Sequence, residues 1–262
     1  MKVARLGAVE YLNARPLVYG LELRTDLFSL RFDVPSKCAA LLHEGSIDVG
    51  MIPSIEYLRG RDYRIVPEVG IISDGPVASV ALFTTTPVAS IRSIAADTSS
   101  RTSHALLRIL CLERFGIDPD FQPMPPDPEQ MLRRCDAALL IGDPALFLDH
   151  ARLGADKIDL GDHWTSLTGL PFVWAFWAGR RDSLSAAAVD ALIAARDSGV
   201  AASDDIAVAY CGADRAARCQ AYLRQNIQYT LGDREKAGLM KYYELAERYG
   251  LVNAVVPALF YR

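Results

Sequence analysis

The chain has 262 residues, enough for one large domain or two modest domains with cores of their own. Hydrophobic residues make up 51% and charged residues 23%, which is ordinary for a globular protein. The formal net charge of -4 offers no strong basic field, so a nucleic-acid partner is not expected.

The start of the chain and its cysteines bear on its compartment. Residues 1–9 are too short and too interrupted for the apolar part of a secretory leader, and no apolar run approaches the roughly 20 residues of a membrane span. The five cysteines are an odd number without CxxC spacing, and Cys38, Cys111 and Cys135 fall in apolar or helical stretches typical of core positions. We therefore expect a reduced, soluble, cytoplasmic protein that does not bind a membrane.

Short apolar runs alternate with helix patterns from the start of the chain, which is typical of an α/β fold. Strands are expected at residues 3–9, 30–34, 47–52, 69–72, 77–84, 94–96, 137–141 and 172–178. Helix patterns cover residues 13–17, 38–44 and 129–134, one ends near residue 116, another starts at residue 144, and several follow between residues 183 and 250.

The strand and helix units fall into two blocks and a helical tail. We expect two α/β lobes: lobe 1 from residues 1–84 plus 176–262, with the tail helices packed on it, and lobe 2 from residues 85–175. The chain would cross out of lobe 1 near Thr85 and return near Phe172.

A hydroxyl-rich loop, residues 97–103, runs into the start of an apolar helix. The first turn of a helix carries unpaired N–H groups and a partial positive charge, which suit a carboxylate or a phosphate. A cap alone would explain one Ser or Thr but not an Arg within the run. We therefore favour an anion site that includes Ser100, Arg101, Thr102 and Ser103 over a cap alone.

Polar turns follow several of the expected strands, at residues 11–13, 53–54, 73–76, 98–103 and 142–144. Because ligands of open α/β sheets bind beyond the carboxyl ends of the strands, these turns are expected to converge on a cleft between the lobes. Their side chains are mainly neutral hydroxyls and amides, with Arg101 and Asp143 in addition, which suits a small polyanion better than a metal ion.

Signatures of other chemistries are missing from the sequence. The four histidines lack paired metal-ligand spacing, and neither the glycine fingerprints of nucleotide sites nor the GxSxG turn of hydrolases occurs. We therefore expect no metal site. His104 lies beside the hydroxyl-rich loop and is a candidate base, although a solvent-facing residue of the first helical turn is the simpler interpretation.

Asn13 and Asp143 each allow a structural and a functional interpretation. Asn13 can cap a helix, or its amide can donate a hydrogen bond to a leaving hydroxyl or a carboxylate in the cleft. Asp143 can also reach the cleft, but the Pro that follows it favours a cap. The tryptophans are expected in the core and in lobe packing: Trp164, Trp174 and Trp177.

Seven strings along the chain form a set: YLNARPL (11–17), VPSK (34–37), IPSIEY (52–57), SDGPVAS (73–79), SSRTS (99–103), LLIGDPAL (139–146) and TGLPFV (168–173). Taken in order, they resemble the chorismate dehydratase family of the futalosine route to menaquinone. The resemblance covers residues 3–178, and the tail is only loosely similar to the family. So many unrelated strings in one order are more specific than any single motif.

The resemblance implies a periplasmic-binding-protein-like fold of type II, with two lobes and a substrate cleft between them. It also implies a hydro-lyase that dehydrates chorismate to 3-[(1-carboxyvinyl)oxy]benzoate, the first step of the futalosine route. That elimination removes a ring proton and the neighbouring hydroxyl and is driven by aromatisation. It therefore requires no cofactor and no metal.

The resemblance also implies roles for individual residues. The family associates catalysis with the Asn of its Tyr-Leu-Asn loop, which is Asn13 here, and we expect Asn13 to hydrogen-bond the reacting centre. Two carboxylates and further oxygens of chorismate need polar partners. The expected substrate-binding residues are Ser54, Ser79, Ser100, Arg101, Thr102, Ser103, Gly142 and Asp143. No base stands out, and the enolpyruvyl carboxylate of the substrate is the candidate proton acceptor.

Two alternatives remain open. A non-catalytic cytoplasmic binder or sensor of a small carboxylate would use the same fold, although exported receptors of this fold carry a signal peptide. The later cyclising enzyme of the pathway would place a His near Gly142 and Asp143, and none stands there. The Ala-rich tail is equally compatible with a homodimer and with packing within one chain.

Overall fold

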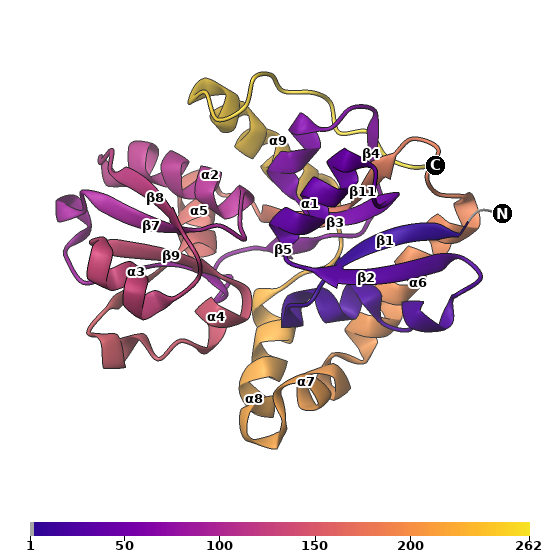
Figure 1. Ribbon diagram of the computed structural model, residues 1–262, viewed down its shortest axis with the longest axis horizontal. Helices are drawn as coiled ribbons and strands as arrows, with labels where there is room; N and C mark the ends of the chain where they lie inside the picture. Colours follow the sequence, from indigo (N-terminus) through magenta and orange to yellow (C-terminus); the bar gives the residue numbers. More distant parts are fainter. Residues whose placement is uncertain (1–2) are drawn as a thin grey trace.

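The structure is a computed structural model that describes residues 3–262. Figure 1 shows two lobes side by side, each with a central sheet covered by helices, and C-terminal helices near their junction. The predicted α/β class and two-lobe layout are confirmed.

The first sheet belongs to lobe 1 and the second to lobe 2. The strands of lobe 1 are β1 (Ala4–Val9), β2 (Phe28–Asp33), β3 (Val49–Pro53), β4 (Tyr63–Ile65), β5 (Ile71–Ser73) and β11 (Phe172–Arg180). Those of lobe 2 are β6 (Val80–Thr84), β7 (Ser93–Asp97), β8 (Asp120–Met124), β9 (Ala137–Ile141) and β10 (Asp156–Asp159). The orders are β2-β1-β3-β11-β4, with β5 paired to β11, and β10-β6-β9-β7-β8. Every residue of β3, β6 and β9 is buried, as expected for central strands covered on both faces.

Helices and short turns connect the strands. The α-helices are α1 (Pro35–Glu44), α2 (Thr102–Leu110), α3 (Pro128–Arg134), α4 (Gly142–Phe147), α5 (Leu160–Thr168), α6 (Ala186–Ala201), α7 (Ser203–Cys211), α8 (Ala213–Ala221) and α9 (Asp233–Arg248). The 3-10 helices are η1 (Leu12–Val18), η2 (Leu21–Leu23), η3 (Ser54–Arg59), η4 (Val88–Ser90) and η6 (His150–Leu153), and η5 (Cys111–Phe115) and η7 (Tyr222–Asn226) are π-helical. Over residues 3–262, no helix is long and apolar enough to cross a membrane.

The sheet pairing corrects the predicted lobe boundaries of 1–84 plus 176–262 and 85–175. β5 pairs with β11 in the first sheet, whereas β6 pairs with β9 and β10 in the second. The turn at residues 74–79 is therefore a crossing between lobes and not a hairpin turn. The chain returns to lobe 1 at Phe172, as expected for the crossing, so only the boundary at residue 176 is too late, because all of β11 pairs within the first sheet. In the sequence, two apolar runs separated by a polar turn look the same whether the strands form a hairpin or belong to different lobes.

An aromatic cluster joins the lobes beneath the cleft. Trp164 comes from α5, Phe172 from β11 and Tyr242 from α9, and all three are fully buried. The Trp164 ring centroid lies 5.2 Å from that of Phe172 and 6.2 Å from that of Tyr242, and the last two are 4.9 Å apart. These edge-to-face contacts fix α9 across the junction of the lobes.

The cysteines only partly follow the sequence expectation. Cys38, Cys111 and Cys135 are free and buried, as predicted. Cys211 and Cys219 form a disulfide, so the expectation of a fully reduced chain is wrong for this pair. Gly212, with a φ of 72°, ends α7 and lets α8 fold back beside it, which brings together two residues separated by 8 positions. Spacing alone gave no signal for that fold-back.

Candidate functional site

A cavity lies between the lobes. Both sheets contribute to it: β1 and β3 of lobe 1 end at the cavity, and so does β9 of lobe 2. Its wall is formed by Val9, Tyr11, Asn13, Pro35, Pro53, Ile71, Val77, Val80, Ser100, Thr102, Ser103, Ile141, Gly142, Trp174 and Ala175. The strand ends therefore converge as predicted, but the wall is more apolar than the turns suggested.

The start of α2 supplies the hydroxyl groups of the cavity. Ser100, Thr102 and Ser103 all line it. The Ser100 hydroxyl accepts a hydrogen bond of 3.2 Å from the backbone N–H of Ser103, so this serine does act as a local cap. The Thr102 hydroxyl accepts a bond of 3.2 Å from the backbone N–H of Ile55 and thereby joins α2 to lobe 1. The cap interpretation therefore holds for Ser100, and the anion site at this loop stays a prediction.

Arg101 does not line the cavity. Its guanidinium donates a hydrogen bond of 2.8 Å to Glu56 of η3, across the lobe junction. Glu56 is fully buried and also contacts Arg59 at 2.6 Å and the His43 ring at 2.9 Å. Burial acts to raise the pKa of Glu56, but the bond from His43 and the charges of Arg59 and Arg101 outweigh it, so this pKa lies below its ordinary value. Arg101 is thus occupied in an ion pair between the lobes.

Asn13 lines the cavity from within η1. The N-cap position of η1 is Tyr11, so the capping interpretation of Asn13 is wrong. Burial raises the pKa of Tyr222, which comes from η7 in the tail, and the neighbouring Asn13 side chain partly counteracts this. Asn13 therefore stands between the cavity and a buried tyrosine.

Ser54 and Ser79 lie behind the cavity wall and are fully buried. The Ser79 hydroxyl accepts a hydrogen bond of 2.7 Å from Tyr222. The Ser54 hydroxyl lies 3.4 Å from that of Thr102, and its carbonyl accepts a bond of 2.6 Å from Tyr243 of α9. Both serines contact groups that support the wall and not the cavity itself.

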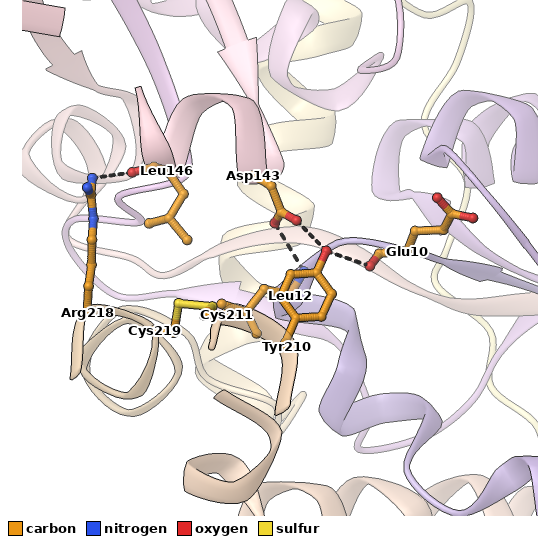
Figure 2. The surroundings of a disulfide bond; sticks show 8 residues. All are labelled: Glu10, Leu12, Asp143, Leu146, Tyr210, Cys211, Arg218 and Cys219. Atoms are coloured by element: carbon orange, nitrogen blue, oxygen red, sulfur yellow. Dashed lines mark hydrogen bonds between the residues drawn. A yellow bond between two sulfur atoms is a disulfide. The ribbon is translucent and has the colours of Figure 1, made fainter. Parts of the chain in front are cut away.

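Gly142 and Asp143 begin α4 at the lobe 2 side of the cavity. Gly142 lines it with a φ of 61°, and a Cβ atom there would lie 2.6 Å from the ring of Tyr11. The N-cap of α4 is Ile141, so Asp143 is not the cap. Its carboxylate instead accepts hydrogen bonds from the backbone N–H of Leu12, at 3.1 Å, and from the hydroxyl of Tyr210 (Figure 2). Asp143 therefore connects lobe 2 to η1 and to the tail.

Sequence reasoning missed three aromatic residues of the site. Tyr11 lines the cavity, as does Trp174, whose indole N–H donates a bond of 3.1 Å to the Ser73 hydroxyl. Tyr222 lies directly behind the wall. The position of Tyr11 next to Leu12 and Asn13 in a polar turn was a usable signal, whereas the tail offered none for Tyr222.

His104 does not line the cavity. It accepts a hydrogen bond of 3.3 Å from Arg108, and its ring centroid lies 5.0 Å from that of Phe121. Burial lowers the pKa of His104 to about 4, so the ring is neutral and only partly exposed, contrary to the solvent-facing interpretation. Among residues 3–262, no group of three or more His, Cys, Asp or Glu side chains is arranged to hold a metal ion.

Comparisons of structure identify the fold. A protein from Archaeoglobus fulgidus superimposes with a TM-score of 0.76 at 20% identity, covering 95% of this chain and 98% of its own. The periplasmic aliphatic sulphonate binding protein SsuA from Escherichia coli gives a TM-score of 0.68 at 20% identity, with 98% and 90% covered. The expected periplasmic-binding-protein-like fold is confirmed.

Comparisons of sequence identify the family. A curated chorismate dehydratase from Thermus thermophilus is 31% identical over 260 residues, which cover 91% of this chain and 93% of that protein. A second, from Campylobacter jejuni, is 32% identical over 165 residues, or 63% of this chain and 58% of its own length. The profile of a family described as menaquinone biosynthesis matches residues 4–248. The chain therefore belongs to the menaquinone biosynthesis family.

Proposed function

We propose that the chain is a hydro-lyase that dehydrates chorismate to 3-[(1-carboxyvinyl)oxy]benzoate. The observation that carries this proposal is the 31% identity to a chorismate dehydratase over 91% of the chain. The cavity agrees with it, because its wall combines aromatic side chains with hydroxyl groups that gather at one helix start.

The hydroxyl and the aromatic residues of the cavity wall bind different parts of the substrate. Thr102 and Ser103 hold a substrate carboxylate at the first turn of α2, where backbone N–H groups and the helix dipole favour an anion. Tyr11 and Trp174 present aromatic side chains to the substrate ring. Ser100 and Gly142 complete the contacts from lobe 2.

The reaction breaks one ring C–H bond and the C–O bond of the neighbouring hydroxyl. The proton and the hydroxide leave together as water, and the ring becomes aromatic, so no electron acceptor is needed. Asn13 hydrogen-bonds the reacting centre, and the enolpyruvyl carboxylate of the substrate takes the ring proton and passes it to the departing hydroxide. The cavity orients these groups and limits access of bulk water.

The remaining predicted residues support the wall. Arg101 fixes the start of α2 through Glu56, and Asp143 fixes α4 against η1. Ser54 and Ser79 act in the same way through Thr102 and Tyr222. These contacts favour positioning roles over the direct substrate contacts that the sequence suggested.

The test is to incubate the purified chain with chorismate, without added cofactor or metal, and to follow the products by chromatography and mass spectrometry. Appearance of the enolpyruvyl benzoate, lighter than chorismate by one water, supports the proposal. Saturable binding of unchanged chorismate by calorimetry would instead favour a non-catalytic binder. That alternative is relevant because the fold is shared with a sulphonate binding protein.

The futalosine route, a cytoplasmic location and a homodimer belong to the same proposal. The route and the location are supported by the sequence resemblance and by the biosynthetic family, since such an enzyme works where its substrate is made. Cell fractionation followed by detection of the chain in each fraction checks the location. Recovery of the chain outside the cytoplasmic fraction would contradict a cytoplasmic location, and sedimentation at several concentrations checks the dimer.

A further inference from the structure

The helix pair α7 and α8, residues 203–221, contacts both lobes and is called the strap below. On the lobe 1 side, α7 packs against η1, and the guanidinium carbon of Arg15 in η1 lies 5.1 Å from the ring centroid of Tyr210. On the lobe 2 side, Arg218 of α8 donates a hydrogen bond to the carbonyl of Leu146 in α4 (Figure 2). The guanidinium carbon of Arg218 also lies 5.7 Å from the ring centroid of Phe147. The strap therefore connects η1 to α4.

A disulfide joins the two helices of the strap beside these contacts. Cys211 directly follows Tyr210, which donates a hydrogen bond to Asp143 of α4, and Cys219 directly follows Arg218 (Figure 2). Gly212 is the one residue between the two helices, and a glycine linker alone leaves the angle between them free to change. The disulfide removes that freedom. It thereby keeps the hydroxyl of Tyr210 and the guanidinium of Arg218 at the spacing at which both reach α4.

The two sulfur atoms differ in access, and the other thiols of the chain do not compete with them. Cys211 is partly exposed, whereas Cys219 is fully buried, so a reductant attacks at Cys211. The three free cysteines are buried: Cys38, Cys111 and Cys135. Burial raises the pKa of Cys38 and of Cys111 to about 12 and also raises that of Cys135, so these thiols do not supply the thiolate needed for disulfide exchange at neutral pH.

We propose that the strap makes substrate binding sensitive to redox state: the closed disulfide holds η1 and α4 in place at the cleft, and its reduction by a dithiol weakens binding. The consequence reaches the substrate because η1 carries Asn13 and α4 begins with Gly142, both of which line the cavity. This inference rests on the proposed function, because the substrate whose binding changes is the one proposed above.

The redox step is an ordinary thiol–disulfide exchange. One thiolate of the dithiol attacks Sγ of Cys211, the bond between the two cysteines breaks, and Cys219 leaves as a thiolate that takes up a proton. The second thiol of the reductant then attacks the mixed disulfide and releases Cys211 as a thiol. The chain gains two electrons and two protons, and the dithiol becomes an internal disulfide.

The kinetic experiment compares oxidised wild type with wild type kept in dithiothreitol, and a Cys211→Ser/Cys219→Ser variant under both conditions. Reduction is expected to raise the KM of the wild type for chorismate about 3- to 10-fold and to leave kcat within about twofold, because the strap does not line the cavity. The variant should show the raised KM under both conditions. Equal KM values for oxidised and reduced wild type, or an equal response of the variant to dithiothreitol, would overturn the proposal. Alkylation with mass spectrometry verifies the state of the pair, and circular dichroism verifies that each protein is folded.

A second pair of variants separates the strap from a general loss of stability. Tyr210→Phe/Arg218→Met keeps the disulfide but lacks both hydrogen bonds to α4, so reduction should change its KM by less than about 1.5-fold. The matched control is Arg248→Met/Tyr249→Phe. It removes a Tyr and an Arg with which α9 and the residue after it contact Glu113 of lobe 2, away from the disulfide, and it should keep the full response. A full response in Tyr210→Phe/Arg218→Met would contradict the strap as the route.

A measurement without substrate distinguishes this inference from the proposed function. Hydrogen–deuterium exchange followed by mass spectrometry compares the oxidised and the reduced wild type. We expect faster exchange on reduction in peptides over residues 10–18 and 142–148, where the backbone N–H of Leu12 donates to Asp143, and no change in β8, an edge strand of lobe 2. Unchanged exchange in the first two peptides would overturn the role of the strap. Absence of chorismate turnover by the oxidised wild type would refute the proposed function alone.

Discussion

The hydroxyl of Tyr210, at the end of α7, donates a hydrogen bond to the carboxylate of Asp143 in the first turn of α4 (Figure 2). The oxygen of the same hydroxyl lies 3.2 Å from the carbonyl oxygen of Glu10. Asp143 in turn accepts from the backbone of Leu12, so one carboxylate holds the tail, lobe 2 and the Asn13-bearing turn together. The tail is thus held to both lobes at the edge of the cleft.

Removing this carboxylate is expected to loosen the cleft. Asp143→Ala loses the bonds from both Leu12 and Tyr210, whereas Tyr210→Phe loses only its own. We predict a rise in KM of about tenfold for Asp143→Ala, with a loss of about 1–2 kcal/mol in unfolding free energy, and a smaller change for Tyr210→Phe. Steady-state kinetics and urea unfolding measure both. An unchanged KM in Asp143→Ala would show that this contact does not position the site.

Position 142 requires glycine for two reasons: its backbone conformation and the closeness of the Tyr11 ring. Its φ is 61°, and a Cβ atom would fall 2.6 Å from the Tyr11 ring. Gly154 has nearly the same φ, 60°, but open space around it. We predict that Gly154→Ala costs about 1 kcal/mol of stability without affecting activity. Gly142→Ala carries the same cost and also displaces Tyr11, so turnover falls as well. Equal activity in the two variants would contradict the role of Tyr11 in the cavity.

The disulfide between Cys211 and Cys219 is expected to contribute to stability by restricting the unfolded chain. A closed loop of this length corresponds to about 2–3 kcal/mol in the chain-entropy description. Reduction with dithiothreitol should therefore lower the Tm of the wild type and leave the Tm of a Cys211→Ser/Cys219→Ser variant unchanged. A wild-type Tm that does not respond to reduction would argue against the pairing.

The Glu56 cluster predicts a specific pH dependence of stability. The pKa of Glu56 in the folded chain lies below its ordinary value of 4.5, so the charged form is favoured by folding. Its contribution is fully present above pH 4.5 and is lost as the pH falls through the lower folded value. We predict that Glu56→Gln is less stable than the wild type by about 3 kcal/mol at pH 7, because Arg59 and Arg101 lose a buried partner.

Urea unfolding of both proteins between pH 7 and pH 3 provides the comparison for Glu56. The difference should shrink towards the acidic end of the range, as Glu56 of the wild type becomes protonated. A difference that stays constant over the whole range would mean that the charge of Glu56 does not carry the effect.

Features governed by local chemistry were predictable from the sequence. The strand at residues 137–141 and the helix start at Thr102 follow from an apolar run and from hydroxyl residues ahead of a helix. The lobe to which β6 belongs was not predictable from the sequence. An apolar strand can pair in either sheet, and the sequence does not show which strands lie beside it. The partners of Arg101 and Asp143 lie 45 and 131 positions away, and no spacing rule connects residues that meet only through folding.

The tail illustrates the same limit. Tyr222 and Tyr210 lie in Ala-rich and charged helices without motifs, yet their hydroxyls reach Ser79 and Asp143. Only the folded positions of α7 and η7 bring these hydroxyls to their partners. Likewise Trp174 belongs to a buried strand, and its place in the cavity wall is seen only once the opposite lobe is in position.

The central claim is tested most directly by following chorismate in the presence of the purified wild type and of Asn13→Ala. We predict that the wild type converts chorismate to the enolpyruvyl benzoate without added cofactor, and that Asn13→Ala is slower by about 100-fold or more while still binding chorismate. Chorismate that remains unchanged with the wild type would contradict the assignment as a dehydratase. Full activity of Asn13→Ala would contradict the site around Asn13.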